Sequence, residues 1–166
     1  MKTEKKIYKR LKESGLTLSL AESCTGGMIS ARLVSQSGIS RYFYGGVVSY
    51  VNEVKEKLLF VDHETLSRHT AVSAPVAEQM ARGVIEQTGS DLGLSVTGLA
   101  GPLGGTPEIP VGRVFVGISQ RGGDTYSVKL TLRGSRRAIR RAAAEAALRA
   151  LLAHMEKIMT EEDKRK

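Results

Sequence analysis

The sequence predicts an α/β protein in which helices cover both faces of a mixed β-sheet, giving three α/β/α layers. As far as residue 97, short apolar or β-branched runs alternate with amphipathic segments, a pattern typical of parallel strands joined by helices. Two alternating runs around a glycine-rich turn then predict an antiparallel hairpin. With 166 residues, 41% of them hydrophobic, the chain is long enough to form one domain over residues 1–166.

The first part of the chain is predicted to alternate helix and strand. Residues 4–14 are basic, place their apolar side chains on one face and stop at Gly15, which predicts a first helix. Residues 16–20 form a short apolar run, expected to be a buried strand, and a helix is expected over residues 26–36. The β-branched side chains of residues 46–51 predict the second strand.

Three helices and a third strand are expected next. Cap residues predict a helix over residues 52–59 and a short one over residues 62–69. An early proline and a terminal glycine delimit a longer helix over residues 73–88. The apolar run over residues 92–97 then predicts the third strand.

The last part of the chain contains a loop, a hairpin and a long helix. A Gly/Pro-rich loop runs to residue 112, and the hairpin is expected to pair residues 114–118 with residues 126–130. An Ala/Arg/Leu-rich helix follows over residues 136–159. A charged tail is expected over residues 160–166.

The charge of the chain favours a small anionic ligand. The formal net charge is +8, concentrated in the first twelve residues and in residues 133–141. Such a balance is compatible with nucleic acid, an anionic metabolite or simple solubility. Aromatic residues make up only 5% of the chain, with no Trp, so the interleaved basic and aromatic side chains that stack single-stranded bases are missing. A nucleic-acid partner is therefore not expected.

Cysteine content and hydropathy predict a cytoplasmic protein. The single cysteine, Cys24, allows no intrachain disulfide and fits a reducing compartment. No apolar run is long enough for a membrane helix, and the N-terminus lacks the apolar core of a signal peptide. We therefore expect no membrane partner. The Ala-rich final helix leaves a homo-oligomer open.

Residues 21–27, Ala-Glu-Ser-Cys-Thr-Gly-Gly, join the predicted first strand to the following helix. This turn places the Ser23 hydroxyl beside backbone N–H groups that can hold an anion or a developing oxyanion. The alternative is an ordinary helix cap followed by a tight glycine turn. Ser23, residues 50–55 and Thr97-Gly98 all follow predicted strand ends, where ligands gather in open α/β sheets. We expect the site there.

A nucleophilic serine needs a base, and Lys55 is the best-placed candidate. The three histidines, His63, His69 and His154, fall in predicted helices away from the strand ends, so a Ser-His-Asp triad is not indicated. No Cys/His cluster or His-Glu-x-x-His motif is present, so no metal is expected. Lysine acts as a base when burial lowers its pKa. The alternative is a solvated helix lysine.

The glycine-rich loop and the last helix offer candidate anion contacts. The loop around Gly104 and Gly105 lacks the Gly-Lys-Ser/Thr ending of a Walker A loop and the spacing of a dinucleotide loop. It either wraps a phosphate or covers a pocket, or is a plain surface loop. Arg136 and Arg140 lie one helical turn apart, which suits contact with a phosphate. The alternative for this pair is a solvated basic face.

Six motifs in order give the chain a family resemblance. They occupy residues 21–27, 50–55, 71–73, 96–102, 104–108 and 110–112. Together they resemble the CinA C-terminal domain family, over about residues 4–155, whose stand-alone members include nicotinamide mononucleotide amidohydrolase. The resemblance implies a cofactor-independent Ser-Lys amidase that converts nicotinamide mononucleotide to nicotinate mononucleotide and ammonia. Larger CinA proteins also carry an N-terminal nucleotide-processing domain, so only the amidase half is expected here.

The resemblance also implies roles for single residues. Ser23 would be the nucleophile and Lys55 its general base, while Tyr50 would orient the lysine or shuttle a proton. Thr97 and the backbone from Thr25 to Gly27 would hold the substrate and the oxyanion, and Arg136 would meet the phosphate. The full implied substrate-binding set is Thr25, Gly26, Gly27, Thr97, Gly98, Gly104, Gly105, Arg136 and Arg140.

Departures from the family pattern bear on the orientation of Arg136 and on substrate choice, and two other hypotheses stay open. Ser135 replaces the family's acidic residue before the arginine, and Leu103 and Ile109 replace loop residues that are often Gly and Lys. One alternative is a nucleotide-binding or regulatory module that keeps the pocket without catalysis. The other, suggested by the net charge and the family's association with competence, is a basic nucleic-acid-binding protein, which would show steeply salt-dependent DNA binding.

Overall fold

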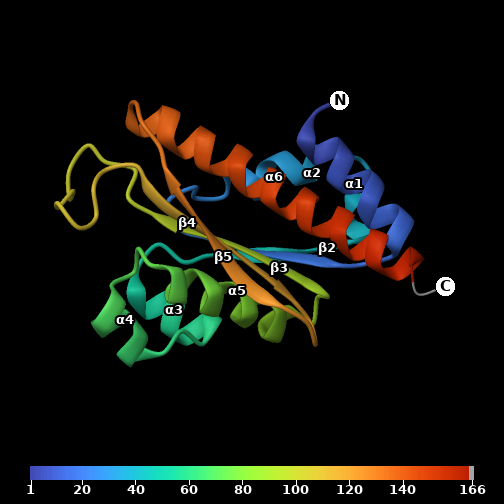
Figure 1. Ribbon diagram of the computed structural model, residues 1–166, viewed down its shortest axis with the longest axis horizontal. Helices are drawn as coiled ribbons and strands as arrows, with labels where there is room; N and C mark the ends of the chain where they lie inside the picture. The colour runs from blue at the N-terminus through green and yellow to red at the C-terminus, as the bar shows by residue number, and fades with distance from the viewer. Residues whose placement is uncertain (165–166) are drawn as a thin grey trace.

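The computed structural model describes residues 1–164, whose strands form one mixed sheet with helices on both faces (Figure 1). The strands are β1 (Leu18–Glu22), β2 (Phe43–Val48), β3 (Leu92–Gly98), β4 (Arg113–Gln120) and β5 (Thr125–Thr131). Their order is β2-β1-β3-β4-β5. β1 is parallel to both of its neighbours, whereas β4 is antiparallel to both β3 and β5. The predicted mixed sheet with its hairpin is confirmed.

Two layers of helices enclose the sheet (Figure 1). One face carries α1 (Thr3–Ser14), α2 (Met28–Val34) and α6 (Arg136–Asp163). The other carries α3 (Asn52–Leu59), α4 (His63–His69) and α5 (Ala74–Thr88). A short 3-10 helix, η1 (Ile39–Arg41), leads into β2. The predicted three-layer α/β/α arrangement is confirmed.

Because β1 is buried on both faces, its alternate side chains enter two different cores. Leu18 and Leu20 are fully buried in the larger core beneath α1, α2 and α6. Ala21 belongs to the smaller core, which α3, α4 and α5 close with Leu59 and Met80 among others. The central strand therefore reads as a continuous apolar run, as strands covered on both faces do.

Helix α5 lies unusually close to the sheet because glycines face it. A Cβ atom on Gly93 would lie 2.1 Å from the Ala81 carbonyl oxygen, and one on Gly117 would lie 2.2 Å from that of Ala77. The Ser95 hydroxyl donates to the same Ala77 oxygen at 2.5 Å. These contacts fix the distance between α5 and strands β3 and β4.

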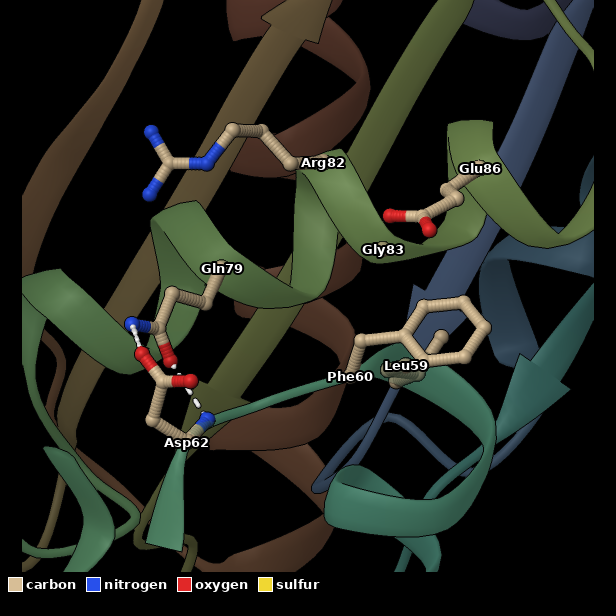
Figure 2. A pocket seen from close by; sticks show the side chains of 7 residues that line it. All are labelled: Leu59, Phe60, Asp62, Gln79, Arg82, Gly83 and Glu86. Carbon is tan, nitrogen blue, oxygen red and sulfur yellow. Dashed lines mark hydrogen bonds between the residues drawn. The ribbon is translucent and has the colours of Figure 1, made fainter. Parts of the chain in front are cut away.

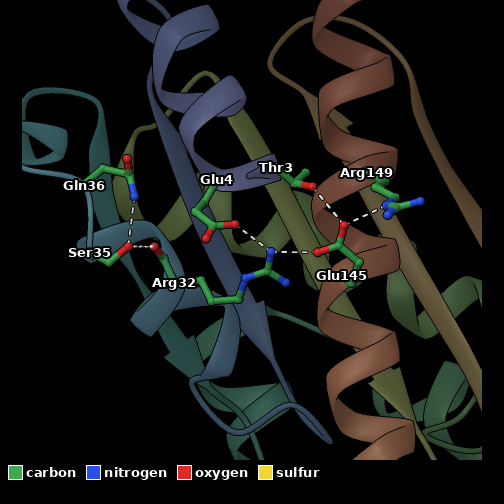
Figure 3. A network of polar contacts seen from close by, with 7 residues as sticks. All are labelled: Thr3, Glu4, Arg32, Ser35, Gln36, Glu145 and Arg149. Atoms are coloured by element: carbon green, nitrogen blue, oxygen red, sulfur yellow. Dashed lines mark hydrogen bonds and ion pairs between the residues drawn. The ribbon is translucent and has the colours of Figure 1, made fainter. Parts of the chain in front are cut away.

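On the other face, a polar network joins three helices (Figure 3). Arg32 of α2 donates to Glu4 of α1 at 2.6 Å and to Glu145 of α6 at 2.7 Å. Thr3 and Arg149 also donate to Glu145. Burial by itself would raise the pKa of Glu145, but hydrogen bonds from Arg149, Arg32 and Thr3 outweigh it and lower that pKa to about 2.

The strand boundaries differ from those expected, and the second strand differs most. β1 covers residues 18–22 rather than 16–20, and β2 covers residues 43–48 rather than 46–51. The Gly-Gly pair at 45–46 lies inside β2, beside a register shift opposite Leu18 and Ser19. A Cβ atom on Gly46 would lie 2.6 Å from the Leu20 carbonyl oxygen. Close strand packing therefore explains this glycine.

The helix boundaries also shift. α2 is shorter than expected, covering residues 28–34 instead of 26–36. α6 continues to Asp163, so the start of the tail predicted from residue 160 is helical. The last two residues of that predicted tail, 165–166, lie outside the described part of the chain.

Candidate active site

Ser23 lies where β1 turns into α2. Its N–H donates to the Val96 carbonyl at 2.9 Å, so the chain still pairs with β3 at this point. Gly26 and Gly27 then adopt φ angles of +57° and +90°, in the region that glycine adopts without steric cost. The reversal leaves Ser23 only 9% exposed, at the carboxyl end of a central parallel strand.

The start of α2 is capped by Glu22. This carboxylate is 1% exposed and accepts N–H bonds from Gly27 at 3.0 Å, Ile29 at 3.1 Å and Ser30 at 2.8 Å, as well as the Ser30 hydroxyl at 2.7 Å. The expectation that these helix N–H groups would hold a substrate anion is therefore corrected, because the protein's own carboxylate occupies them. The signal in the sequence is an acidic residue that closes an apolar strand directly before a helix.

Lys55 reaches Ser23 from the first turns of α3. The lysine is 1% exposed, and its Nζ lies 3.4 Å from the Ser23 Oγ. Nζ also donates to the Ser49 carbonyl oxygen at 2.6 Å, a partner that sequence reasoning missed. Among the side chains that the structure describes, no carboxylate forms an ion pair with it. Burial lowers the pKa of Lys55, so the solvated-lysine alternative does not describe this residue.

Tyr50 and Arg136 meet at the mouth of the site. Tyr50 follows β2 and is 58% exposed, and its hydroxyl accepts a hydrogen bond from the Arg136 Nη2 at 2.7 Å. The Arg136 Nη1 donates to the Gly101 carbonyl at 2.7 Å. Arg136 thus ties the segment after β2 to the glycine-rich loop. The structure turns the Tyr50 hydroxyl to Arg136, with no hydrogen bond to Lys55.

These residues surround a cavity of about 230 Å³. Its walls contain six of the predicted site residues, namely Ser23, Tyr50, Lys55, Thr97, Gly98 and Arg136. Val72 and Leu99 add apolar surface, and Asn52 adds an exposed amide at the start of α3. The cavity therefore combines a hydroxyl, a buried amine, an apolar wall and a cationic rim.

Other predicted residues lie elsewhere or serve another purpose. Gly104 and Gly105 are exposed in the loop and do not line the cavity. The Thr97 hydroxyl donates to the Ala71 carbonyl at 2.6 Å, so its proton is already used. Thr25 is fully buried within the turn, next to Gly26. These four residues give no direct support for substrate contacts by their side chains.

Arg140 contacts the protein's own backbone. Its Nε donates to the Cys24 carbonyl and its Nη2 to the Thr25 carbonyl, both at 2.9 Å. A Cβ atom on Gly26 would lie 3.1 Å from this Nη2. The expected phosphate contact is therefore corrected for Arg140, because its guanidinium is directed at the Ser23 turn.

Cys24, beside the serine, is not an activated thiol. It is 5% exposed, and burial raises its pKa to about 11. The thiol is therefore protonated at neutral pH, and the thiolate form needed for nucleophilic attack is rare. Ser23 is the nucleophile candidate in this turn.

A second cavity of about 230 Å³ lies between the end of α3 and α5 (Figure 2). Asp62 and Gln79 close one side of it through two hydrogen bonds, of 2.9 Å and 2.7 Å. Its lining residues are Leu59, Phe60, Asp62, Gln79, Arg82, Gly83 and Glu86. They include no Ser, Cys or Lys, so the nucleophile and base identified above belong to the cavity at Ser23.

Two further properties concern residues 1–164 only. No cluster of three or more His, Cys, Asp or Glu side chains is placed to hold a metal ion there. None of the helices in this range is long and apolar enough to cross a membrane.

Fold and site together define an α/β/α protein with a buried Ser-Lys pair at the carboxyl end of its central parallel strands. Residues 1–155 match the model of the CinA C-terminal domain. The chain belongs to this family.

Relatives and solved structures agree with this assignment. A CinA-like protein of Kosmotoga olearia is 48% identical over 145 residues, covering 87% of this chain and 35% of the relative. A CinA-like protein of Dictyoglomus thermophilum is 49% identical over 137 residues, covering 82% of this chain and 33% of the relative. The chain thus spans about a third of the length of these curated relatives.

Two solved structures share the fold along nearly their whole length. The competence/damage inducible protein CihA from Agrobacterium tumefaciens has a TM-score of 0.88 and 37% identity, covering 91% of this chain and 92% of that one. The CinA superfamily protein KP700603 from Klebsiella pneumoniae has a TM-score of 0.89 and 31% identity, covering 95% of this chain and 99% of that one.

Proposed function

We propose that this protein is a Ser-Lys amidohydrolase that converts nicotinamide mononucleotide to nicotinate mononucleotide and ammonia. The observation that carries the proposal is the buried Lys55 Nζ, 3.4 Å from the Ser23 Oγ and without an acidic partner among the described side chains. A lysine whose pKa is lowered by burial can accept the proton of a serine hydroxyl. Family membership supports the same chemistry.

In the first half-reaction, neutral Lys55 takes the proton of Ser23 while Oγ bonds to the carboxamide carbon. The carbonyl π electrons move to oxygen, giving a tetrahedral oxyanion. When this intermediate collapses, the C–N bond breaks, and the lysine ammonium gives its proton to the departing nitrogen, which leaves as ammonia. An acyl ester remains on Ser23, and Lys55 is neutral again.

In the second half-reaction, water replaces ammonia. Lys55 removes a proton from the water as its oxygen bonds to the ester carbon, and the new tetrahedral intermediate expels the Ser23 oxygen. The lysine returns the proton to that oxygen. The carboxylic acid product ionises, so the net change is one amide and one water converted to a carboxylate and an ammonium ion.

The oxyanion needs donors, and the backbone N–H groups of Cys24 and Thr25 are available for it, because they have no acceptor in the described chain. The next two N–H groups are already engaged. That of Gly26 donates to the Ser23 carbonyl at 3.0 Å, and that of Gly27 donates to Glu22. We assign the Cys24 and Thr25 N–H groups to the oxyanion, in place of the wider Thr25 to Gly27 set expected from the sequence.

A mononucleotide suits the remainder of the cavity. Val72 and Leu99 offer an apolar wall for a pyridine ring, so that its carboxamide faces Ser23. Arg136, exposed at the mouth, is the arginine left to meet the phosphate, since Arg140 is engaged by the turn. A bound phosphate would take the guanidinium contacts that Tyr50 and Gly101 now accept.

The proposal is tested by incubating the purified protein with nicotinamide mononucleotide and EDTA and measuring ammonia and the nucleotide product. We expect turnover that EDTA leaves unchanged, because lysine rather than a metal-bound water supplies the base. Ser23→Ala and Lys55→Ala should abolish turnover and keep the fold by circular dichroism. Ammonia release by Ser23→Ala would refute the nucleophile, whereas thermal stabilisation by the nucleotide without turnover would favour the binding-module hypothesis.

A further inference from the structure

We propose that Arg140 and Glu22 are positioning residues that fix the main chain of the Ser23 turn and so aim the Cys24 and Thr25 N–H groups into the active site. This inference rests on the proposed function. It concerns two residues that do not line the cavity and whose contacts are all with the protein itself.

Arg140 sets the direction of the Thr25 N–H. The Cys24 carbonyl and the Thr25 N–H belong to one planar trans peptide, so they point in opposite directions. Because the Arg140 Nε holds that carbonyl at 2.9 Å, the Thr25 N–H must point away from Arg140. The planar guanidinium holds the next carbonyl, that of Thr25, at the same distance, which fixes two consecutive peptides.

The Cys24 N–H is fixed by the same reasoning. It shares a peptide plane with the Ser23 carbonyl, and that carbonyl accepts the Gly26 N–H at 3.0 Å. The Gly26 N–H in turn shares its peptide with the Thr25 carbonyl that Arg140 holds. A change at Arg140 therefore disturbs both proposed oxyanion donors.

Glu22 holds the other end of the turn. Four hydrogen bonds from Gly27, Ile29 and Ser30 reach its buried carboxylate, although Glu22 and Gly27 are separated by the entire turn. The residue directly before the nucleophile is thereby tied to Gly27, the N-cap of α2, and to the first turn of that helix. Glu22 and Arg140 together leave the turn little freedom to rotate its peptides.

Steady-state kinetics on nicotinamide mononucleotide separate positioning from substrate binding. For Arg140→Gln we expect kcat to fall by about 10- to 100-fold, as when an oxyanion donor is displaced. KM should change by less than about threefold, and the acid limb of the pH profile should keep its midpoint, because Lys55 is untouched. Arg140→Lys should recover part of the loss. Arg141→Gln, an exposed neighbour with the same charge change, should match the wild type.

A second measurement needs no substrate. NMR-detected amide exchange should be faster at Gly26 and Gly27 in Arg140→Gln than in Arg141→Gln, while core amides stay protected. Glu22→Gln should show the same at either Gly27 or Ser30, because these two N–H groups bond to different carboxylate oxygens and glutamine keeps only one acceptor oxygen. Ser30→Ala, which removes only the hydroxyl bond, gives a milder test should Glu22→Gln fail to fold.

The outcomes are distinct. A rise in KM with unchanged kcat in Arg140→Gln would make Arg140 a substrate ligand and overturn the inference. Unchanged exchange at Gly26 and Gly27 would overturn it as well, whatever the kinetics. Wild-type protein that does not hydrolyse the nucleotide would refute the proposed function, and the exchange measurement would still decide whether these residues hold the turn.

Discussion

At the scale of single residues, the burial of Lys55 is the most consequential feature. An ammonium group removed from water without a counter-charge is costly, so burial favours the neutral amine. The Ser49 carbonyl accepts one N–H of the Lys55 amine. This bond fixes the orientation of the amine's lone pair and of its other hydrogen. The side chain is thereby prepared to accept a proton at the pH where an exposed lysine would hold one.

This predicts how activity and stability depend on pH. As pH rises through the lowered folded-state pKa of Lys55, kcat/KM should increase, with the midpoint below the ordinary 10.5. Between these two pKa values the unfolded chain binds more protons than the folded one, so stability should also rise with pH. Lys55→Met should be inactive and lose this part of the stability slope, measured as Tm across the window. An activity midpoint at or above 10.5 would contradict the assignment of Lys55 as base.

The neighbouring Cys24 should be poorly reactive. Burial raises its pKa from 9.0 to about 11, so its thiolate fraction at pH 8 should be about 100-fold below that of a free thiol. Iodoacetamide should therefore modify the native protein at least this much more slowly than the protein unfolded in guanidinium, measured by mass spectrometry. Equal rates in the two states would show that the thiol is exposed.

At the scale of elements, α5 depends on the glycines that face it. Gly117→Ala would place a Cβ atom 2.2 Å from the Ala77 carbonyl oxygen and 2.4 Å from the Ser95 Oγ. Because both belong to closely packed elements, we expect a loss of about 3 kcal/mol in the free energy of unfolding. Urea unfolding measures it. Gly123→Ala is the matched control, since its nearest neighbour is the flexible Gln120 side chain at 3.3 Å, and equal midpoints for the two variants would contradict the close approach.

The network of α1, α2 and α6 predicts a second effect on stability (Figure 3). Arg32→Met would leave Glu4 and Glu145 without their shared cation, and we expect a loss of about 2 kcal/mol at pH 7, since the group is only partly buried. The folded-state pKa of Glu145 is lowered to about 2, so its stabilisation is present above 4.5 and lost as pH falls towards 2.

Thermal unfolding between pH 7 and pH 2.5 measures both effects. The wild type should lose Tm on acidification more steeply than Arg32→Met, which has already lost part of this interaction. Arg149→Met is a useful comparison, because Arg149 is 73% exposed and contacts Glu145 alone. Parallel acid profiles for wild type and Arg32→Met would show that the network does not couple to pH.

At the scale of the whole molecule, hydropathy patterns and end signals were enough to predict the layers and the order of elements. The apolar runs of β1 and β3 became strands that helices cover on both faces. The boundaries of strands were predicted less well, because glycine occurs both in turns and inside closely packed strands. The second strand was expected to begin at residue 46, but Gly45 and Gly46 both lie inside β2, where Gly46 packs closely against Leu20.

The sequence predicted several of the residues that line the site, but it did not predict all of their contacts. Strand ends and motifs brought Ser23, Lys55 and Arg136 to one cavity. Sequence spacing did not reveal that Glu22 would occupy the helix N-terminus, or that Arg140 would bond to carbonyls 116 and 115 residues earlier. The Arg140 partners depend on how α6 crosses the sheet, and no local pattern specifies that crossing.

The long separation of Arg140 from the Ser23 turn also has a consequence for protein synthesis. Ser23 and Lys55 leave the ribosome before β3, which carries the acceptor of the Ser23 N–H, and α6 emerges after both. A nascent chain that ends before α6 has the serine and the lysine but lacks the guanidinium that holds their turn. On the proposed function, activity should therefore appear only after α6 has been synthesised, so products truncated before α6 should not hydrolyse the amide.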